Sequence, residues 1–122
     1  MILVDSSVWI DHLHTTDETL FELLEQSTVS VHPMVIGELA LGQIRDRSTV
    51  LSLLANLPSA EVAEHREVMD LIESHHLFGR GLSLIDAHLL ASAAISSDTQ
   101  LWTRDKRLDA AAADVGIAYP GA

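Results

Sequence analysis

The sequence predicts an α/β fold in which a parallel β-sheet carries helices on both faces. Short apolar runs of strand character alternate along the chain with helical segments of roughly ten to fifteen residues, as in a sheet wound with crossover helices. Hydrophobic residues make up 48% of the 122 residues, which is enough to bury one core. Because no linker or internal repeat divides the chain, we expect residues 1–122 to form a single domain.

The first half of the chain contains two expected strands. Residues 2–4 form a continuous apolar run, which predicts a buried strand, and the three residues after it are good helix caps. Residues 28–31 are rich in β-branched side chains and predict the second strand. The expected helices are one that begins after Asp5-Ser6-Ser7, one capped by Thr16 or Asp17, one from Pro33 to near Gly42, and one that is capped by Asp46 or Ser48 and stopped by Pro58.

The second half repeats the alternation of strands and helices. Ser83 precedes a long Ala-rich segment and is a good N-cap, so the longest helix should begin there. The expected elements are a short strand at 60–62, helices at 64–76, 84–96 and 105–113, and strands at 100–103 and 117–119. These elements complete the alternating α/β pattern.

Four carboxylates lie where an apolar strand gives way to a helix, or near the start of a helix: Asp5, Glu38, Asp86 and Asp105. Ligands of open parallel sheets bind at the carboxyl ends of the strands. Carboxylates gathered there repel one another unless a cation lies among them, and Mg²⁺ or Mn²⁺ prefers oxygen ligands. The pattern predicts a metal-dependent enzyme that acts on phosphates, with all four acids catalytic and with Asp5, Asp86 and Asp105 as metal ligands.

Three further residues are expected to support this site. Ser6 and Thr103 carry the hydroxyls nearest to the acids in sequence and could orient a metal-bound water or a phosphate. Asp109 follows Asp105 by four residues, so it shares that face of the helix and could add an outer ligand. A metal at such a site produces a nucleophilic water at neutral pH and stabilises charge on the leaving oxygen.

The formal net charge of −11 counts against a nucleic-acid partner, because binding phosphates usually needs a basic face. Most of the cations, however, lie close in sequence to the four acids. The candidates for contact with a phosphate backbone are Arg45, Arg47, Arg80, Arg104, Lys106 and Arg107. The alternative is that each is an ordinary surface charge that pairs with a nearby acid.

Several classes of protein are excluded or disfavoured by what the sequence lacks. It has no cysteine, so no disulfide or thiolate zinc site is available. Its seven histidines show no spacing typical of a helical zinc site, and there is no Gly-rich phosphate loop or nucleophile elbow. No Lys or Arg precedes Arg45, and the longest stretch without Lys, Arg, Asp or Glu, 48–60, is too short to span a bilayer. We therefore expect a soluble, cytoplasmic protein.

Four motifs, taken together, resemble the PIN domain and, more narrowly, the VapC toxins of type II toxin–antitoxin systems. They are Val4-Asp5-Ser6-Ser7, the segment PMVIGEL at 33–39, LIDAHLLA at 84–91 and LWTRDKRL at 101–108. The resemblance covers the whole chain, and the family's acidic quartet falls on the four acids named above. His32 departs from it, since many relatives have a small hydroxyl residue at that position.

The resemblance implies a five-stranded parallel sheet in the order 3-2-1-4-5 between layers of helices. It also implies a Mg²⁺- or Mn²⁺-dependent endoribonuclease that is inhibited by a cognate VapB-like antitoxin and often forms a homodimer. Single-stranded loops of transfer or ribosomal RNA are the expected substrates, because their unstacked bases are accessible.

Other functions remain open from the sequence alone. A receiver-like phosphoacceptor domain has a similar length, but it would need a second acid beside Asp5, an aspartate after the third strand and a lysine after the last. The chain instead has Ser6, Glu61 and a single Lys106. A DNA-cleaving 5′-nuclease usually has a longer chain, and a catalytically silent binding module would not need an intact set of acids.

Overall fold

The computed structural model describes residues 1–121, which contain three β-strands and seven α-helices. The strands are β1 (Ile2–Val4), β2 (Val29–Ser30) and β3 (Gln100–Trp102). The helices are α1 (Ser6–His14), α2 (Glu18–Glu25), α3 (Pro33–Leu41), α4 (Arg47–Ala55), α5 (His65–Ser74), α6 (Leu84–Ile95) and α7 (Lys106–Val115). The predicted α/β class is confirmed.

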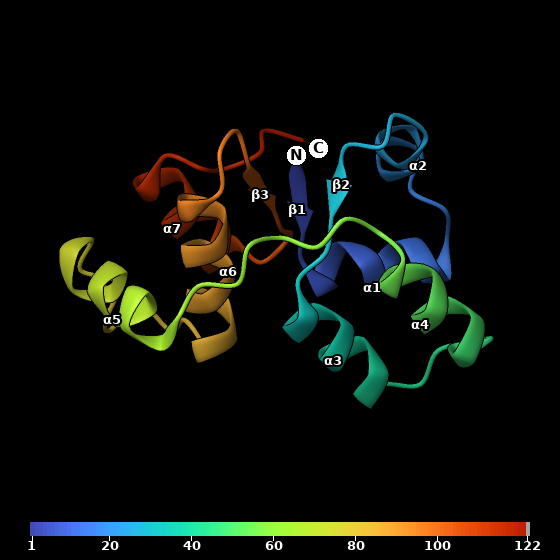
Figure 1. Cartoon of the computed structure of the whole chain (residues 1–122), viewed down its shortest axis with the longest axis horizontal. Helices are drawn as coiled ribbons and strands as arrows, with labels where there is room; N and C mark the ends of the chain where they lie inside the picture. The colour runs from blue at the N-terminus through green and yellow to red at the C-terminus, as the bar shows by residue number, and fades with distance from the viewer. Residues whose placement is uncertain (122) are drawn as a thin grey trace.

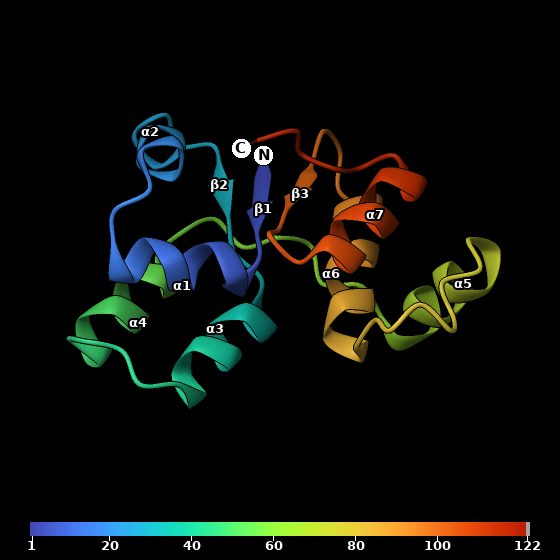
Figure 2. The same cartoon turned by 180° about the vertical axis from the view of Figure 1, so that it is seen from behind.

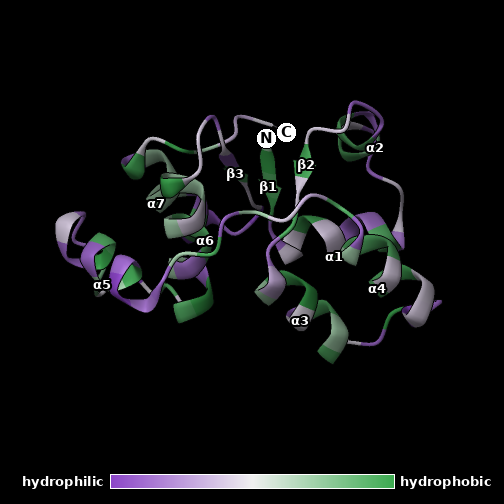
Figure 3. Cartoon of the chain, in the orientation of Figure 1, coloured by the Kyte–Doolittle hydropathy of each residue, from purple (hydrophilic) through white to green (hydrophobic). Residues whose placement is uncertain are grey.

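The sheet is parallel, and its strands lie in the order β2-β1-β3. Ile2 at the start of β1 is in register with Val29 on one side and Gln100 on the other. Because β1 has a neighbour on each edge and helices above and below, it needs apolar residues throughout, and Figure 3 shows it in hydrophobic colours. Leu3 and Val4 are fully buried. The two chain ends lie close together in Figures 1 and 2.

The expected strands at 60–62 and 117–119 do not form within residues 1–121, so the prediction of five strands is wrong in number. Single parallel bridges stand in their places, Val31 with Ser59 and Leu101 with Ala118. Pro58, which lacks the N–H that a ladder needs, directly precedes Ser59. Residues 61 and 62 are also exposed. The result is a short central sheet whose edges are not extended.

Local capping chemistry determines most helix starts, and the predicted starts agree with the structure to within a few residues. Asp17 caps α2 by accepting a hydrogen bond from the Leu20 N–H at 2.9 Å. Pro33 occupies the first turn of α3, where no N–H is needed. Ser83 caps α6 in a reciprocal capping box with Asp86.

Helices cover both faces of the sheet. Both α6 and α7 contact β3 and each other; α6 lies in front of α7 in Figure 1 and behind it in Figure 2, which shows the opposite side. Trp102 and Trp9 are 1% and 4% exposed, as expected for core residues. None of the helices in the described part of the chain is long and apolar enough to cross a membrane.

Candidate active site

The carboxyl ends of β1 and β3 bring together side chains that lie far apart in the sequence. Asp5 follows β1, and its backbone N–H donates to the Trp102 carbonyl at 2.9 Å. The Asp5 side chain is buried, and its Oδ2 accepts hydrogen bonds from the Ser7 hydroxyl at 2.8 Å and from the Thr103 hydroxyl at 2.7 Å. The two strand ends are therefore joined through one carboxylate oxygen.

Backbone N–H groups of the segment that follows β3 set the orientation of both hydroxyls. The Arg104 N–H donates to Ser7 Oγ at 3.0 Å, and the Asp105 N–H donates to Thr103 Oγ1 at 3.0 Å. Each hydroxyl accepts one backbone proton and directs its own proton to Asp5. Sequence reasoning named Thr103 but missed Ser7, although its position two residues after Asp5 at a helix start was an available signal.

Glu38 reaches the same site from α3. Ser6 Oγ donates to Glu38 Oε1 at 3.2 Å and lies 3.5 Å from Asp5 Oδ1, so this hydroxyl links the two acids. Burial raises the pKa of the Glu38 carboxyl, and the negative charges of Asp5 and Asp86 raise it further. The hydrogen bond from Ser6 opposes this shift. Glu38 therefore holds its proton more tightly than an exposed glutamate.

The raised pKa of Glu38 predicts a pH-dependent stability in the metal-free protein. The folded state binds this proton more tightly than the unfolded chain, whose ordinary value is 4.5. Proton binding at Glu38 therefore makes its whole contribution to the free energy of unfolding below pH 4.5, and this contribution is lost as the pH rises through the pKa of the folded state. Relative to Glu38→Gln, the wild-type protein should lose free energy of unfolding between that value and neutral pH. Urea unfolding in chelator at several pH values measures this difference. If the free energies of unfolding of the two proteins changed with pH in parallel, the prediction would be refuted.

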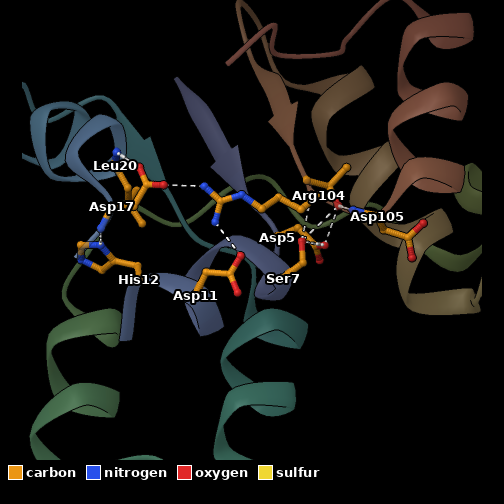
Figure 4. Close-up of polar contacts among 9 residues, drawn as sticks. Asp5, Ser7, Asp11, His12, Asp17, Leu20, Arg104 and Asp105 are labelled. Atoms are coloured by element: carbon orange, nitrogen blue, oxygen red, sulfur yellow. Dashed lines mark hydrogen bonds and ion pairs between the residues drawn. The ribbon is translucent and has the colours of Figure 1, made fainter. Parts of the chain in front are cut away.

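Asp86 and Asp105 both cap helices, and each does so with a single carboxylate oxygen. Asp86 Oδ2 accepts from the Ser83 N–H at 3.0 Å. Asp105 Oδ1 accepts from the N–H groups of Arg107 and Leu108 at 2.9 and 3.2 Å. In Figure 4 the Asp105 carboxylate points away from Asp5. In residues 1–121 the other oxygen of each group has no hydrogen-bond partner, so Asp86 Oδ1 and Asp105 Oδ2 remain available.

The described side chains do not form a closed metal cage. Within residues 1–121, no three Asp, Glu or His side chains lie close enough to bind one ion together. The donor set nevertheless fits a hard divalent cation, because it consists of carboxylate and hydroxyl oxygens. Burial is the main cause of the raised pKa of Glu38, and the negative charges of Asp5 and Asp86, which add to it, are ones that a cation would neutralise. Asp109 is exposed, and no hydrogen bond ties its side chain to the described acids.

Half of the candidate RNA-contact cations are held within the chain. Figure 4 shows Arg104 extended between Asp11 and Asp17, with which it forms ion pairs; its guanidinium also lies 5.6 Å from the centre of the Trp102 ring. Arg80 pairs with Asp114 at 2.8 Å, and Arg47 donates twice to the Ala40 carbonyl, at 2.8 and 3.2 Å. The remaining three are Arg45, Lys106 and Arg107. Their side chains form no hydrogen bond or ion pair with any described residue.

His32 has a structural role at the start of α3. Its side chain is fully buried, and its Nδ1 accepts the Met34 N–H at 3.0 Å as a helix cap. Burial lowers its pKa, and neighbouring His88 lowers it further. A neutral ring is thus favoured, which fits the cap because a protonated Nδ1 could not accept a hydrogen bond.

Replacing Thr103 by Val should destabilise the protein without changing the charge of the site. The change removes the donor to Asp5 Oδ2 and leaves the Asp105 N–H without its acceptor. We expect a loss of about 1–3 kcal/mol, as for buried hydrogen bonds to charged groups. Chemical unfolding in chelator measures this, with Thr49→Val, an exposed position on α4, as the matched control. Equal stability of the two variants would contradict the role assigned to this hydroxyl.

The family model of the PIN domain matches residues 2–114 of this chain. The chain therefore belongs to the PIN-domain family, and the resemblance inferred from its four motifs is confirmed. Among curated proteins it is similar to Ribonuclease VapC32 of Mycobacterium tuberculosis, from the strains CDC 1551 / Oshkosh and ATCC 25618 / H37Rv. The identity to each is 53% over 118 residues, which cover 97% of this chain and 95% of that protein.

A solved structure has the same fold. The crystal structure of PAE2754 from Pyrobaculum aerophilum aligns with a TM-score of 0.59 and 23% sequence identity. The alignment covers 90% of this chain and 84% of that one. At this level of identity the likeness concerns the fold alone.

Proposed function

We propose that this chain is a cytoplasmic, Mg²⁺- or Mn²⁺-dependent endoribonuclease toxin that hydrolyses phosphodiester bonds in single-stranded loops of transfer or ribosomal RNA. The observation that carries this proposal is the buried Asp5, linked through Ser6 to Glu38 at the carboxyl end of the sheet. The 53% identity to a protein named a ribonuclease supports it.

In the proposed mechanism three of the acids hold the ion, and Glu38 moves a proton. Asp5, Asp86 and Asp105 would hold the ion, each with a carboxylate oxygen that its main hydrogen bonds leave available. When bound, the ion supplies a water of lowered pKa and stabilises charge on the leaving oxygen. Glu38, whose pKa is raised, is suited to accept a proton from the attacking water at Oε2, since Oε1 already accepts from Ser6.

The experiment is cleavage of a single-stranded RNA by the purified protein, with the chemistry of the new ends determined. We expect cleavage with Mg²⁺ or Mn²⁺, ends that carry a phosphate on one side and free hydroxyls on the other, and no cleavage in excess chelator. Ends with a 2′,3′-cyclic phosphate would mean that the RNA 2′-hydroxyl had attacked. That result, or cleavage in chelator, would overturn the metal–water mechanism.

We also propose that a VapB-like antitoxin packs an apolar helix into a groove formed by α1, α2 and α4. This groove has a cavity of 250 Å³, and it is lined by Trp9, His12, Leu13, Leu24, Val50, Leu53, Leu54 and Leu57. Leu53 is 64% exposed although it is apolar. The acid site would attract an Arg or Lys of the same partner, because charged side chains bridge carboxylates strongly. A homodimer of the toxin stays a prediction.

Leu53→Glu should prevent formation of the antitoxin complex while free toxin still cleaves RNA. The substitution places a charge in the apolar groove, where its burial under a partner helix would be unfavourable. Co-expression of the variant with the gene that lies next to the gene of this chain, which is expected to encode the antitoxin, followed by co-purification, measures the effect. Leu41→Glu is the matched control, since Leu41 is 91% exposed and does not line the groove. A stable complex with Leu53→Glu would place the antitoxin elsewhere.

A further inference from the structure

A second cavity adjoins the acid site and shares one lining residue, Leu13, with the apolar groove around Leu53. It lies between α1, α3 and the loop 42–46, has a volume of 580 Å³, and includes Glu38 in its wall. Figure 1 shows α3 below α1 and to the left of α4. The volume is within the roughly 300–1,000 Å³ of small-molecule sites. Its wall therefore connects the catalytic acids with a space large enough for a ligand.

The lining of this cavity combines apolar and polar side chains. Ile10, Leu39 and Ile44 contribute apolar surface, and Ile10 is 46% exposed. Gln43 and Arg45 lie in the loop, both exposed. A cavity with apolar walls and a few polar groups is suited to a heteroaromatic ring that carries a charged substituent.

Arg45 gives this cavity a positive charge in a chain whose net charge is −11. The nearby Arg47 is held by the Ala40 carbonyl, and Arg104 is held by two carboxylates. In the described residues no hydrogen bond or ion pair occupies the Arg45 side chain. Of the candidate RNA-contact cations, it is the one that lines a cavity shared with a catalytic acid.

We propose that this cavity binds one unstacked nucleotide of the RNA substrate, adjacent to the phosphate that is cleaved. The base lies between the apolar side chains of Ile10, Leu39 and Ile44. The Gln43 amide, which both donates and accepts hydrogen bonds, reads the edge of the base. The Arg45 guanidinium contacts the phosphate of that nucleotide. This inference rests on the proposed ribonuclease function and makes the cavity a determinant of sequence preference.

Binding in the absence of cleavage tests the Arg45 contact. Fluorescence polarisation with a short single-stranded RNA, in chelator and over a range of salt concentrations, compares wild type with Arg45→Gln. We expect the variant to bind about 10-fold more weakly, with a salt slope smaller by about one. Arg66→Gln, on an exposed position of α5 outside the cavity, should bind as wild type does. Equal affinities and slopes for all three proteins, or no RNA binding by wild type, would overturn the proposal.

Filling the cavity tests the base-binding part. Gly42 has ordinary backbone angles of φ −88° and ψ 177°, and an added Cβ would contact only the Leu39 carbonyl oxygen, at 3.6 Å. Gly42→Phe can therefore be introduced without backbone strain. With a mixture of RNA sequences, we expect the KM of this variant to rise about 10-fold and the base preference at one position beside the cut to weaken, as expected when a pocket is filled. Its melting temperature should match that of wild type.

The outcomes separate this inference from the proposed function. If wild type cleaves RNA and Gly42→Phe retains both the wild-type KM and base preference, the cavity does not bind a nucleotide, although the enzyme is a ribonuclease. Loss of antitoxin binding alone in Gly42→Phe and Arg45→Gln would also overturn the inference and make the cavity a protein contact. If wild type cleaves no RNA, the proposed function fails, while the binding measurement still decides whether the cavity holds a nucleotide.

Discussion

Asp86→Asn is expected to abolish RNA cleavage while the metal-free protein stays as stable as wild type or becomes more stable. Activity should fall by at least about 100-fold, beyond the effect of residues that only support metal ligands. The helix cap should survive, because the amide oxygen of Asn can accept the Ser83 N–H in place of Asp86 Oδ2. The substitution also removes a negative charge that raises the pKa of Glu38, so repulsion inside the site decreases.

Melting curves with and without Mg²⁺, beside a cleavage assay, measure both parts of this prediction. Mg²⁺ should raise the melting temperature of wild type more than that of Asp86→Asn, because ligand stabilisation follows affinity for the folded state. Asp70→Asn, an exposed position on α5, is the charge-matched control and should resemble wild type. An active Asp86→Asn protein with an undiminished Mg²⁺ shift would remove Asp86 from the site.

Asp5→Ala should also abolish cleavage, but with a large loss of stability. The Ser7 hydroxyl in α1 and the Thr103 hydroxyl after β3 both donate to Asp5 Oδ2, and both are oriented by backbone N–H donors. Without the carboxylate both donors lose their shared acceptor, and since the two hydroxyls lie 3.3 Å apart, only one of them can donate to the other instead. We expect the free energy of unfolding to fall by about 2–4 kcal/mol, the range for a broken buried network.

Urea unfolding in chelator distinguishes the two aspartates. Both substitutions remove one negative charge, but only Asp5→Ala should lower the free energy of unfolding. Asp86 caps a helix at the surface, whereas Asp5 joins the ends of two strands. Asp70→Ala controls for the loss of an exposed carboxylate. If Asp5→Ala unfolded at the same urea concentration as Asp70→Ala, the hydrogen bonds around Asp5 would not contribute to stability.

Strands and helix starts that depend on residues adjacent in sequence were predictable from the sequence. A buried central strand follows from the apolar run at 2–4, and the starts of α2, α3 and α6 follow from Asp17, Pro33 and Ser83. These features involve hydrogen bonds and dihedral preferences within about one helical turn. The outer strands were not predictable in this way, because a strand exists only through its partner. At both edges of the sheet the pairing ends after one bridge.

The sequence by itself determined the fold class, the family and the four acids, because spacing and residue type are properties of the chain. The tertiary structure decided which residues surround those acids. Asp5 meets Thr103 across 98 positions of sequence, and Arg104 is held by Asp11 and Asp17 instead of lying free for RNA. Both outcomes require β1 and β3 to lie side by side, since strand pairing sets which distant side chains come within the few ångströms that hydrogen bonds and ion pairs require.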